Sequence, residues 1–141
     1  LVPSPRDPVY QVRYTGPPEN FTLPKALTYL PEQRVEFVDR RDVALALIAS
    51  VMNKEAYRKV FNIAGGGSWQ MPGKDYTAAV CEALGVNPSK ARYPETPALL
   101  HINWYDTTES QRILDFHRTS FHSFIREVKD LATSFLTSGF V

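Results

Sequence analysis

The chain has 141 residues, a hydrophobic fraction of 43% and a mean hydropathy of −0.27, values typical of one soluble globular domain. Its 16 basic and 15 acidic residues give a net charge of +1, so we expect no general attraction to nucleic acid or to a membrane surface. The longest apolar run is too short to span a bilayer, and the only cysteine, Cys81, cannot form an internal disulfide, so a reduced, cytoplasmic protein is expected.

Proline dominates the first part of the chain. Seven of the eleven prolines fall in residues 1–33, and proline removes a backbone donor and disfavours helix at the residue before it. Residues 9–15 (VYQVRYT) are β-branched and aromatic, and they predict one strand. We therefore assign residues 1–33 to a proline-rich arm with one strand and residues 34–141 to a folded domain.

The domain opens with a strand-helix-strand pattern. Residues 35–38 and residues 60–64 (VFNIA) predict short buried strands. Between them, Asp42 is a favourable N-cap for a helix over residues 43–53. That helix is apolar on every side over two turns, so it needs neighbours on more than one face. A chain of this size offers limited cover, and we therefore expect a two-fold homodimer.

Three more helices are predicted after the second strand. Pro72 suits the first turn of a helix that Gly85 ends. Asp106 begins an Asp-x-x-Glu variant of the capping box, which predicts a short helix after it. Thr119 or Ser120 caps a last helix with a clear apolar stripe. The predicted fold class is α/β in the broad sense, a mixed α+β domain with a small mixed sheet, some parallel pairing and about four helices.

Few residues are candidates for catalysis. The histidines, His101, His117 and His122, are scattered, and they are interpreted as surface or capping residues rather than metal ligands. Cys81 lies in the middle of a predicted helix and is interpreted as a small packing residue. We assign no catalytic residue and no metal site.

Two features are candidates for substrate binding. Arg40 and Arg41 stand before a predicted helix start, where backbone N–H groups and guanidinium groups both favour a phosphate; a solvated turn is the alternative. The glycines at 65–67 follow a predicted strand, and they form either a flexible turn or a surface that lets a ligand approach the backbone. They are not a dinucleotide fingerprint, because the third glycine of G-x-G-x-x-G is replaced by Gln70.

Four segments resemble the C-terminal half of the extended short-chain dehydrogenase/reductases, the NAD(P)-dependent nucleotide-sugar epimerases and dehydratases. They are FVDRRDVALAL, KVFNIAGG, YDTTESQRILDF and RTSFHSFIREV, in the order of that family and within residues 34–131. The resemblance implies that the chain is the substrate-side C-terminal part of such a protein. Its partners would be a nucleotide-sugar-like small molecule and a missing N-terminal Rossmann half.

The departures from the family pattern limit what can be carried over. Asp39 and Arg40 replace the usual histidine and its apolar neighbour, and Asp115 replaces a glycine. The arginine that contacts the nucleotide diphosphate in sugar epimerases corresponds to Val35, one residue from Arg34. The catalytic Tyr-x-x-x-Lys does not occur, so the resemblance implies a chain that is catalytically incomplete alone and binds neither NAD nor NADP, although the full-length family member would bind one of them. The candidate substrate-binding residues are Arg34, Arg40, Arg41, Gly65, Gly66 and Gly67.

Two other interpretations remain open. The chain could be a non-catalytic binding or dimerisation module that kept the C-terminal lobe of the family, or an unrelated small α/β domain. Binding of a nucleotide sugar without a cofactor would favour the first interpretation. Tight self-association without a ligand would favour a dimerisation module.

Overall fold

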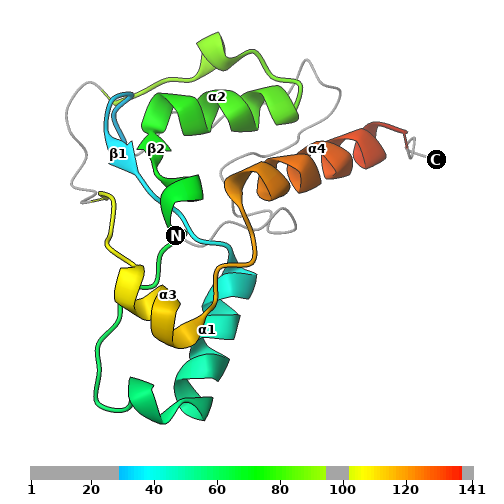
Figure 1. The fold of residues 1–141 in the computed structure, drawn as a ribbon. Coiled ribbons are helices and arrows are strands. Elements are labelled where there is room, and N and C mark those ends of the chain that lie inside the picture. The colour runs from blue at the N-terminus through cyan, green and yellow to red at the C-terminus, as the bar shows by residue number, and fades with distance from the viewer. Residues whose placement is uncertain (1–28, 95–101, 138–141) are drawn as a thin grey trace.

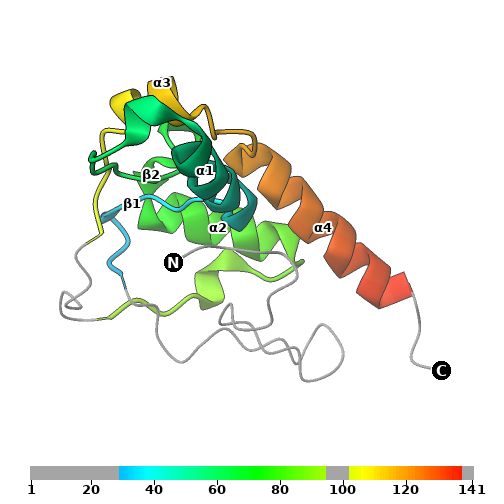
Figure 2. The ribbon, with the colours of Figure 1, turned by 90° about the horizontal axis from the view of Figure 1, so that it is seen from below.

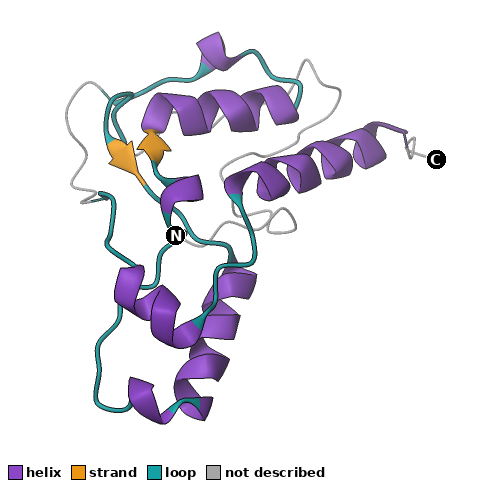
Figure 3. Ribbon diagram, viewed as in Figure 1, coloured by secondary structure: helices purple, strands orange, loops and turns teal. Residues whose placement is uncertain are grey.

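The described part of the chain is a mixed α+β structure with four α-helices and one two-stranded sheet (Figure 1, Figure 3). In this computed structural model the described residues are 29–94 and 102–137, so the strand predicted for residues 9–15 lies outside them. The broad α+β class predicted from the sequence is confirmed. The elements are β1 (Arg34–Val35), α1 (Arg40–Met52), β2 (Met71–Pro72), α2 (Gly73–Ala83), α3 (Thr108–Leu114) and α4 (Phe121–Thr137), with short 3-10 turns η2 (Lys54–Ala56), η3 (Gly67–Trp69) and η4 (Pro88–Lys90).

The helices form two groups, each with its own apolar core. α2 lies beside α4, and α1 lies beside α3, as the view from below also shows (Figure 2). The first core surrounds the fully buried Trp69, and the second surrounds the fully buried Phe116. No helix in the described residues is long and apolar enough to cross a lipid bilayer.

The sheet differs from the prediction. β1 and β2 pair in antiparallel register, with Arg34 opposite Pro72 and Val35 opposite Met71, where some parallel pairing was expected. The strand predicted for residues 60–64 is wrong: that segment is irregular, and Val60 is 97% exposed. A strand needs a neighbouring strand for its backbone hydrogen bonds. In the described part of the chain, no strand pairs with residues 60–64.

The start of α1 is held by Asp39, not by Asp42 as predicted. Asp39 Oδ1 accepts a hydrogen bond from the backbone N–H of Arg41 at 2.8 Å, which makes Asp39 the N-cap. The Arg41 guanidinium donates to both Asp39 oxygens at 2.9 Å and to Glu127 of α4 at 2.9 Å. Burial raises the pKa of the Asp39 carboxyl, but these hydrogen bonds from Arg41 outweigh it and hold that pKa below its usual value.

Asp42 instead lies inside the first turn of α1 and binds the segment that joins α3 to α4. Its side chain is 1% exposed, and Oδ2 accepts from the backbone N–H groups of Arg118 at 3.1 Å and Thr119 at 3.0 Å. Oδ1 accepts from the Thr119 hydroxyl at 3.1 Å. These partners lie 76 and 77 residues away along the chain, which is why a local capping pattern misassigned the residue.

Asp42→Ala is expected to lower the free energy of unfolding by about 3 kcal/mol, because two backbone donors and one hydroxyl lose their acceptor in a partly buried place. Asp42→Asn keeps one acceptor oxygen, and its amide can donate to the Thr119 hydroxyl, so a loss of about 1 kcal/mol is expected. Urea unfolding followed by circular dichroism measures both. If alanine proves as mild as asparagine, the anchoring role is wrong.

The end of α2 is as predicted. Gly85 adopts a φ of +70°, and its N–H donates to the carbonyl of Glu82 at 3.1 Å while the N–H of Val86 donates to the carbonyl of Cys81 at 2.8 Å. This pair of bonds is a Schellman motif, in which glycine accepts the left-handed backbone without a steric cost. Burial raises the pKa of the Cys81 thiol, and the side chain is fully buried, in agreement with a packing residue.

The starts of α3 and α4 also follow local signals. Asp106 Oδ1 accepts from the N–H of Thr108, the first residue of α3, at 2.9 Å, although the N-cap position itself is Thr107. Ser120 Oγ accepts from the N–H of Ser123 at 3.1 Å, which confirms Ser120 as a cap of α4. Both short polar side chains therefore satisfy backbone donors that the helix leaves unpaired.

α1 turns Ala46 toward the protein and most of its large apolar residues outward. Ala46 is 2% exposed, whereas Val51 and Met52 are 86% and 80% exposed. At 3.6 residues per turn, the outward residues share one side of the helix. We define the α1 apolar face as the five exposed large apolar residues of α1 and two that follow the helix. The helix residues are Leu45, Leu47, Ile48, Val51 and Met52, and the two that follow are Tyr57 and Val60.

Candidate functional site

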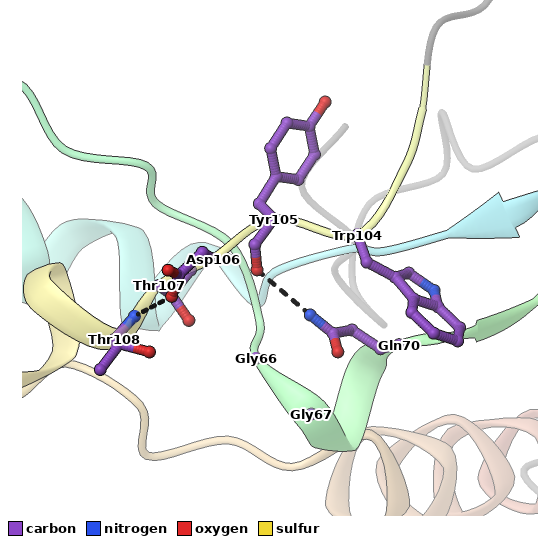
Figure 4. Close-up of a pocket in the computed structure, with 8 residues that line it drawn as sticks. All are labelled: Gly66, Gly67, Gln70, Trp104, Tyr105, Asp106, Thr107 and Thr108. Carbon is purple, nitrogen blue, oxygen red and sulfur yellow. Dashed lines mark hydrogen bonds between the residues drawn. The ribbon is translucent and has the colours of Figure 1, made fainter.

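An open cavity of about 440 Å³ lies between the glycine turn and the segment that leads into α3 (Figure 4). We call it the cup. One wall comes from the turn that follows residues 60–64, and the other comes from residues 104–108. The lining residues are Gly66, Gly67, Gln70, Trp104, Tyr105, Asp106, Thr107 and Thr108.

Glu36 connects the two walls of the cup from the buried side. Its side chain accepts from the N–H of Gly66 at 2.8 Å, from the N–H of Tyr105 at 2.7 Å and from Gln70 Nε2 at 3.1 Å. The residue is 7% exposed, and hydrogen bonds to a carboxylate are stronger than those between neutral groups. Gln70 Nε2 also donates to the carbonyl of Tyr105 at 3.2 Å (Figure 4). Glu36 therefore sets the distance between the walls.

The sequence analysis did not single out Glu36. The available signal was an acidic residue inside an apolar run, between Val35 and Phe37. A carboxylate in such a place needs several hydrogen-bond donors, because burial of an unpaired charge is costly. The identity of those donors depends on segments about 30 and 69 residues away, and no local pattern names them.

The shape of the cup depends on Gly66, which has a φ of +70°. A Cβ there would lie 2.7 Å from Cε1 of His117. The His117 ring is half-buried, and its Nε2 lies 2.7 Å from the carbonyl oxygen of Ala64, so the ring nitrogen is the donor. His117 thus supports the back of the glycine turn. His122 is exposed, and His101 lies outside the described residues.

The predicted anion site of two arginines and a glycine turn is not assembled in this form. Arg41 is bound to Asp39 and Glu127, Arg40 is exposed, and neither arginine lines the cup. The physical reason is that α1 begins at Arg40, so both arginines belong to its first turn, and the nearby carboxylates bind the second of them.

The other four candidate residues lie at or near the cup. Gly66 and Gly67 line it. The Arg34 guanidinium carbon lies 4.7 Å from the ring centroid of Trp104, a lining residue, which is a cation–π distance. Gly65 is buried behind the wall against Phe37 and Trp69. The structure therefore adds Trp104, which the sequence did not single out, and residues 105–108, which were noted as part of a resemblance and, at Asp106, as a helix cap.

No family model, curated protein or solved structure matches this chain significantly. Among residues 29–94 and 102–137, no group of three or more histidine, cysteine, aspartate or glutamate side chains is placed to hold a metal ion. The cup and the α1 apolar face are the features of the described residues that bear on function.

Proposed function

We propose that this chain is the substrate-side part of an NAD(P)-dependent epimerase/dehydratase-like protein, and that the cup holds part of a nucleotide-sugar-like substrate. One observation carries the proposal. Two of the segments that resemble the extended short-chain dehydrogenases, about 40 residues apart, contribute to a single cavity, the first through Gly66 and the second through residues 105–108. Binding sites are commonly built from such converging loops on a packed scaffold.

A backbone feature gives independent support to the resemblance. Asp115, which replaces a family glycine, has a φ of +45° and a ψ of +57° and ends α3 in the left-handed region. That conformation favours glycine and is tolerated by aspartate and asparagine. The position thus keeps the geometry that a glycine would serve, although its residue has changed.

The glycine turn does not fit a dinucleotide. A Cβ at Gly65 would meet the backbone oxygen of Phe37 at 2.2 Å and the Trp69 ring at 2.4 Å, so the missing Cβ makes room for the protein's own core rather than for a pyrophosphate. With no Tyr-x-x-x-Lys either, the chain is proposed to be catalytically incomplete. NAD or NADP would be held by a further lobe, and the α1 apolar face is a surface on which such a lobe could pack.

The two tryptophans offer a direct test of ligand binding. Trp69 is fully buried and donates its indole N–H to the carbonyl of Thr119 at 2.8 Å, whereas Trp104 is 40% exposed at the cup. In NMR spectra, UDP-glucose at millimolar concentration is expected to shift the Trp104 indole signal and leave the Trp69 signal in place, with Trp104→Phe assigning the two. NAD⁺ and NADP⁺ are expected to shift neither. An unmoved Trp104 signal with UDP-glucose would contradict the proposed substrate. A shift of either indole signal with NAD⁺ or NADP⁺ would contradict the proposal that the cofactor is held by a further lobe.

The second candidate function is a non-catalytic binding or dimerisation module. The α1 apolar face favours it, because several large apolar residues exposed on and just after one helix are typical of protein interaction sites. Self-association without any ligand, together with no response to UDP-glucose, would support this candidate over the first.

A further inference from the structure

The cup is lined by hydrogen-bond acceptors and hydroxyl groups. The Asp106 carboxylate is exposed, and it accepts from the N–H of Thr108 at 2.9 Å and is also hydrogen-bonded by the Thr108 side chain. Gln70 uses its amide nitrogen for Glu36 and Tyr105, which leaves its amide oxygen as an acceptor for a ligand. Thr107 and Thr108 add two hydroxyls, each able to donate and to accept.

The charges around the cup disfavour a phosphate inside it. Asp106 lines the cavity, and the Glu36 carboxylate lies directly behind its wall, bound to lining residues on both sides. No lysine or arginine is among the lining residues. An anion in the cup would therefore meet two negative charges at short range, and like charges repel.

Among the described residues, the Arg34 guanidinium lies beside the cup, and the lining itself carries no positive charge. Arg34, a residue of β1, lies over the ring of Trp104, which lines the cavity. Trp104 itself presents an amphipathic indole that can pack against the C–H groups of a sugar ring, while its N–H can donate to a hydroxyl. The arrangement thus separates a polar cavity that carries a carboxylate from a cationic border.

We propose that the cup binds a neutral, hydroxyl-rich ring, with the Asp106 carboxylate accepting hydrogen bonds from ring hydroxyls and with any phosphate of the ligand outside, toward Arg34. The inference rests on the proposed function, since it concerns the same site. It replaces the expectation that the glycine turn binds an anion.

Asp106→Asn tests the inference through the sign of its effect. The amide keeps one oxygen for the N–H of Thr108, so the start of α3 is retained, and it loses one charged acceptor. Bound hydroxyls would then lose a charge-assisted bond, and binding of UDP-glucose is expected to weaken about tenfold. A phosphate in the cup would instead bind more tightly after the negative charge is removed. Asp130→Asn, an exposed position on α4, is the matched control and is expected to have no effect.

Affinities are measured from the Trp104 indole shift with three probes: UDP-glucose, UDP and methyl α-D-glucopyranoside. Weakening of UDP-glucose but not UDP by Asp106→Asn assigns the hexose to the cup, and equal weakening of both assigns the ribose. Unchanged or tighter binding of UDP-glucose overturns the inference while the proposed function stands. The ring site is supported if methyl α-D-glucopyranoside shifts the Trp104 signal and Asp106→Asn abolishes that shift. If UDP-glucose then binds no more tightly than the glucoside, the nucleotide-sugar assignment is removed. No shift with any probe overturns both.

Discussion

Gly65→Ala is expected to destabilise the chain by more than about 3 kcal/mol, because the new methyl group overpacks a part of the core that cannot yield. Its Cβ would lie 2.2 Å from the backbone oxygen of Phe37 and 2.4 Å from the Cγ and Cδ1 atoms of Trp69. Trp69 is fully buried between rings of α4 and donates its indole N–H to a backbone carbonyl. Neither neighbour can move without breaking other contacts.

Gly67→Ala is the matched control, two positions along the same turn. No atom lies within 4 Å of a Cβ built at Gly67, so the substitution is expected to change the free energy of unfolding by less than about 0.5 kcal/mol. Gly66→Ala should fall between the two, because it combines a φ of +70° with a contact of 2.7 Å to the His117 ring. Thermal unfolding gives the order of stability directly. A Gly67 variant as unstable as the Gly65 variant would contradict the packing described here.

This order resolves an alternative that the sequence left open. The three glycines were interpreted either as a flexible turn or as a close approach to a ligand. Gly65 is required for a close approach, but to the Phe37 and Trp69 core, and Gly66 is required for its positive φ. Only Gly67 is placed where neither reason applies. Three identical letters therefore have three different physical roles, which only the surrounding packing can distinguish.

The helices were predictable because their determinants are local. Apolar spacing, the stop at Gly85 and the cap at Ser120 each depend on residues within four positions, and α2, α3 and α4 lie close to the predicted ranges. The strands were predictable only in part: residues 35–38 are buried as predicted but only Val35 lies in β1, and residues 60–64 form no strand. An apolar run such as residues 60–64 shows a tendency to be buried or paired, but pairing depends on a partner elsewhere in the chain.

The residues that organise the site were missed for the same reason. Glu36 and Asp42 are both buried carboxylates whose donors lie between 30 and 77 residues away. Asp42 stands near a helix start and so fits the pattern of a cap, and Glu36 was not singled out by any local pattern. Arg41 looked like a phosphate ligand and is instead bound to Asp39 and Glu127. A sequence identifies such groups as chemically costly to bury, but it does not name the groups that compensate them.

The α1 apolar face is the point on which sequence and structure agree most closely. The sequence predicted a helix that needs cover on more than one side, and the described residues cover mainly the side of Ala46. A stable dimer buries roughly 800 Å² on each partner, and seven large apolar side chains that are 40% to 97% exposed offer an area of that order. A second copy of the chain is the occupant we propose when no other lobe is present.

The isolated chain is therefore expected to self-associate, and Ile48→Gln combined with Val51→Gln is expected to abolish the association. These side chains are 62% and 86% exposed, so their replacement costs little folding stability. Each buried apolar side chain contributes roughly 1.5–3 kcal/mol to an interface, so the double variant should raise the dimer dissociation constant by at least about 100-fold. A control pair, Lys129→Gln with Asp130→Gln on the exposed side of α4, should leave it unchanged. Light scattering over a hundredfold dilution gives the mass. A wild-type chain that stays at 16.0 kDa throughout would show that the α1 apolar face does not pair with itself.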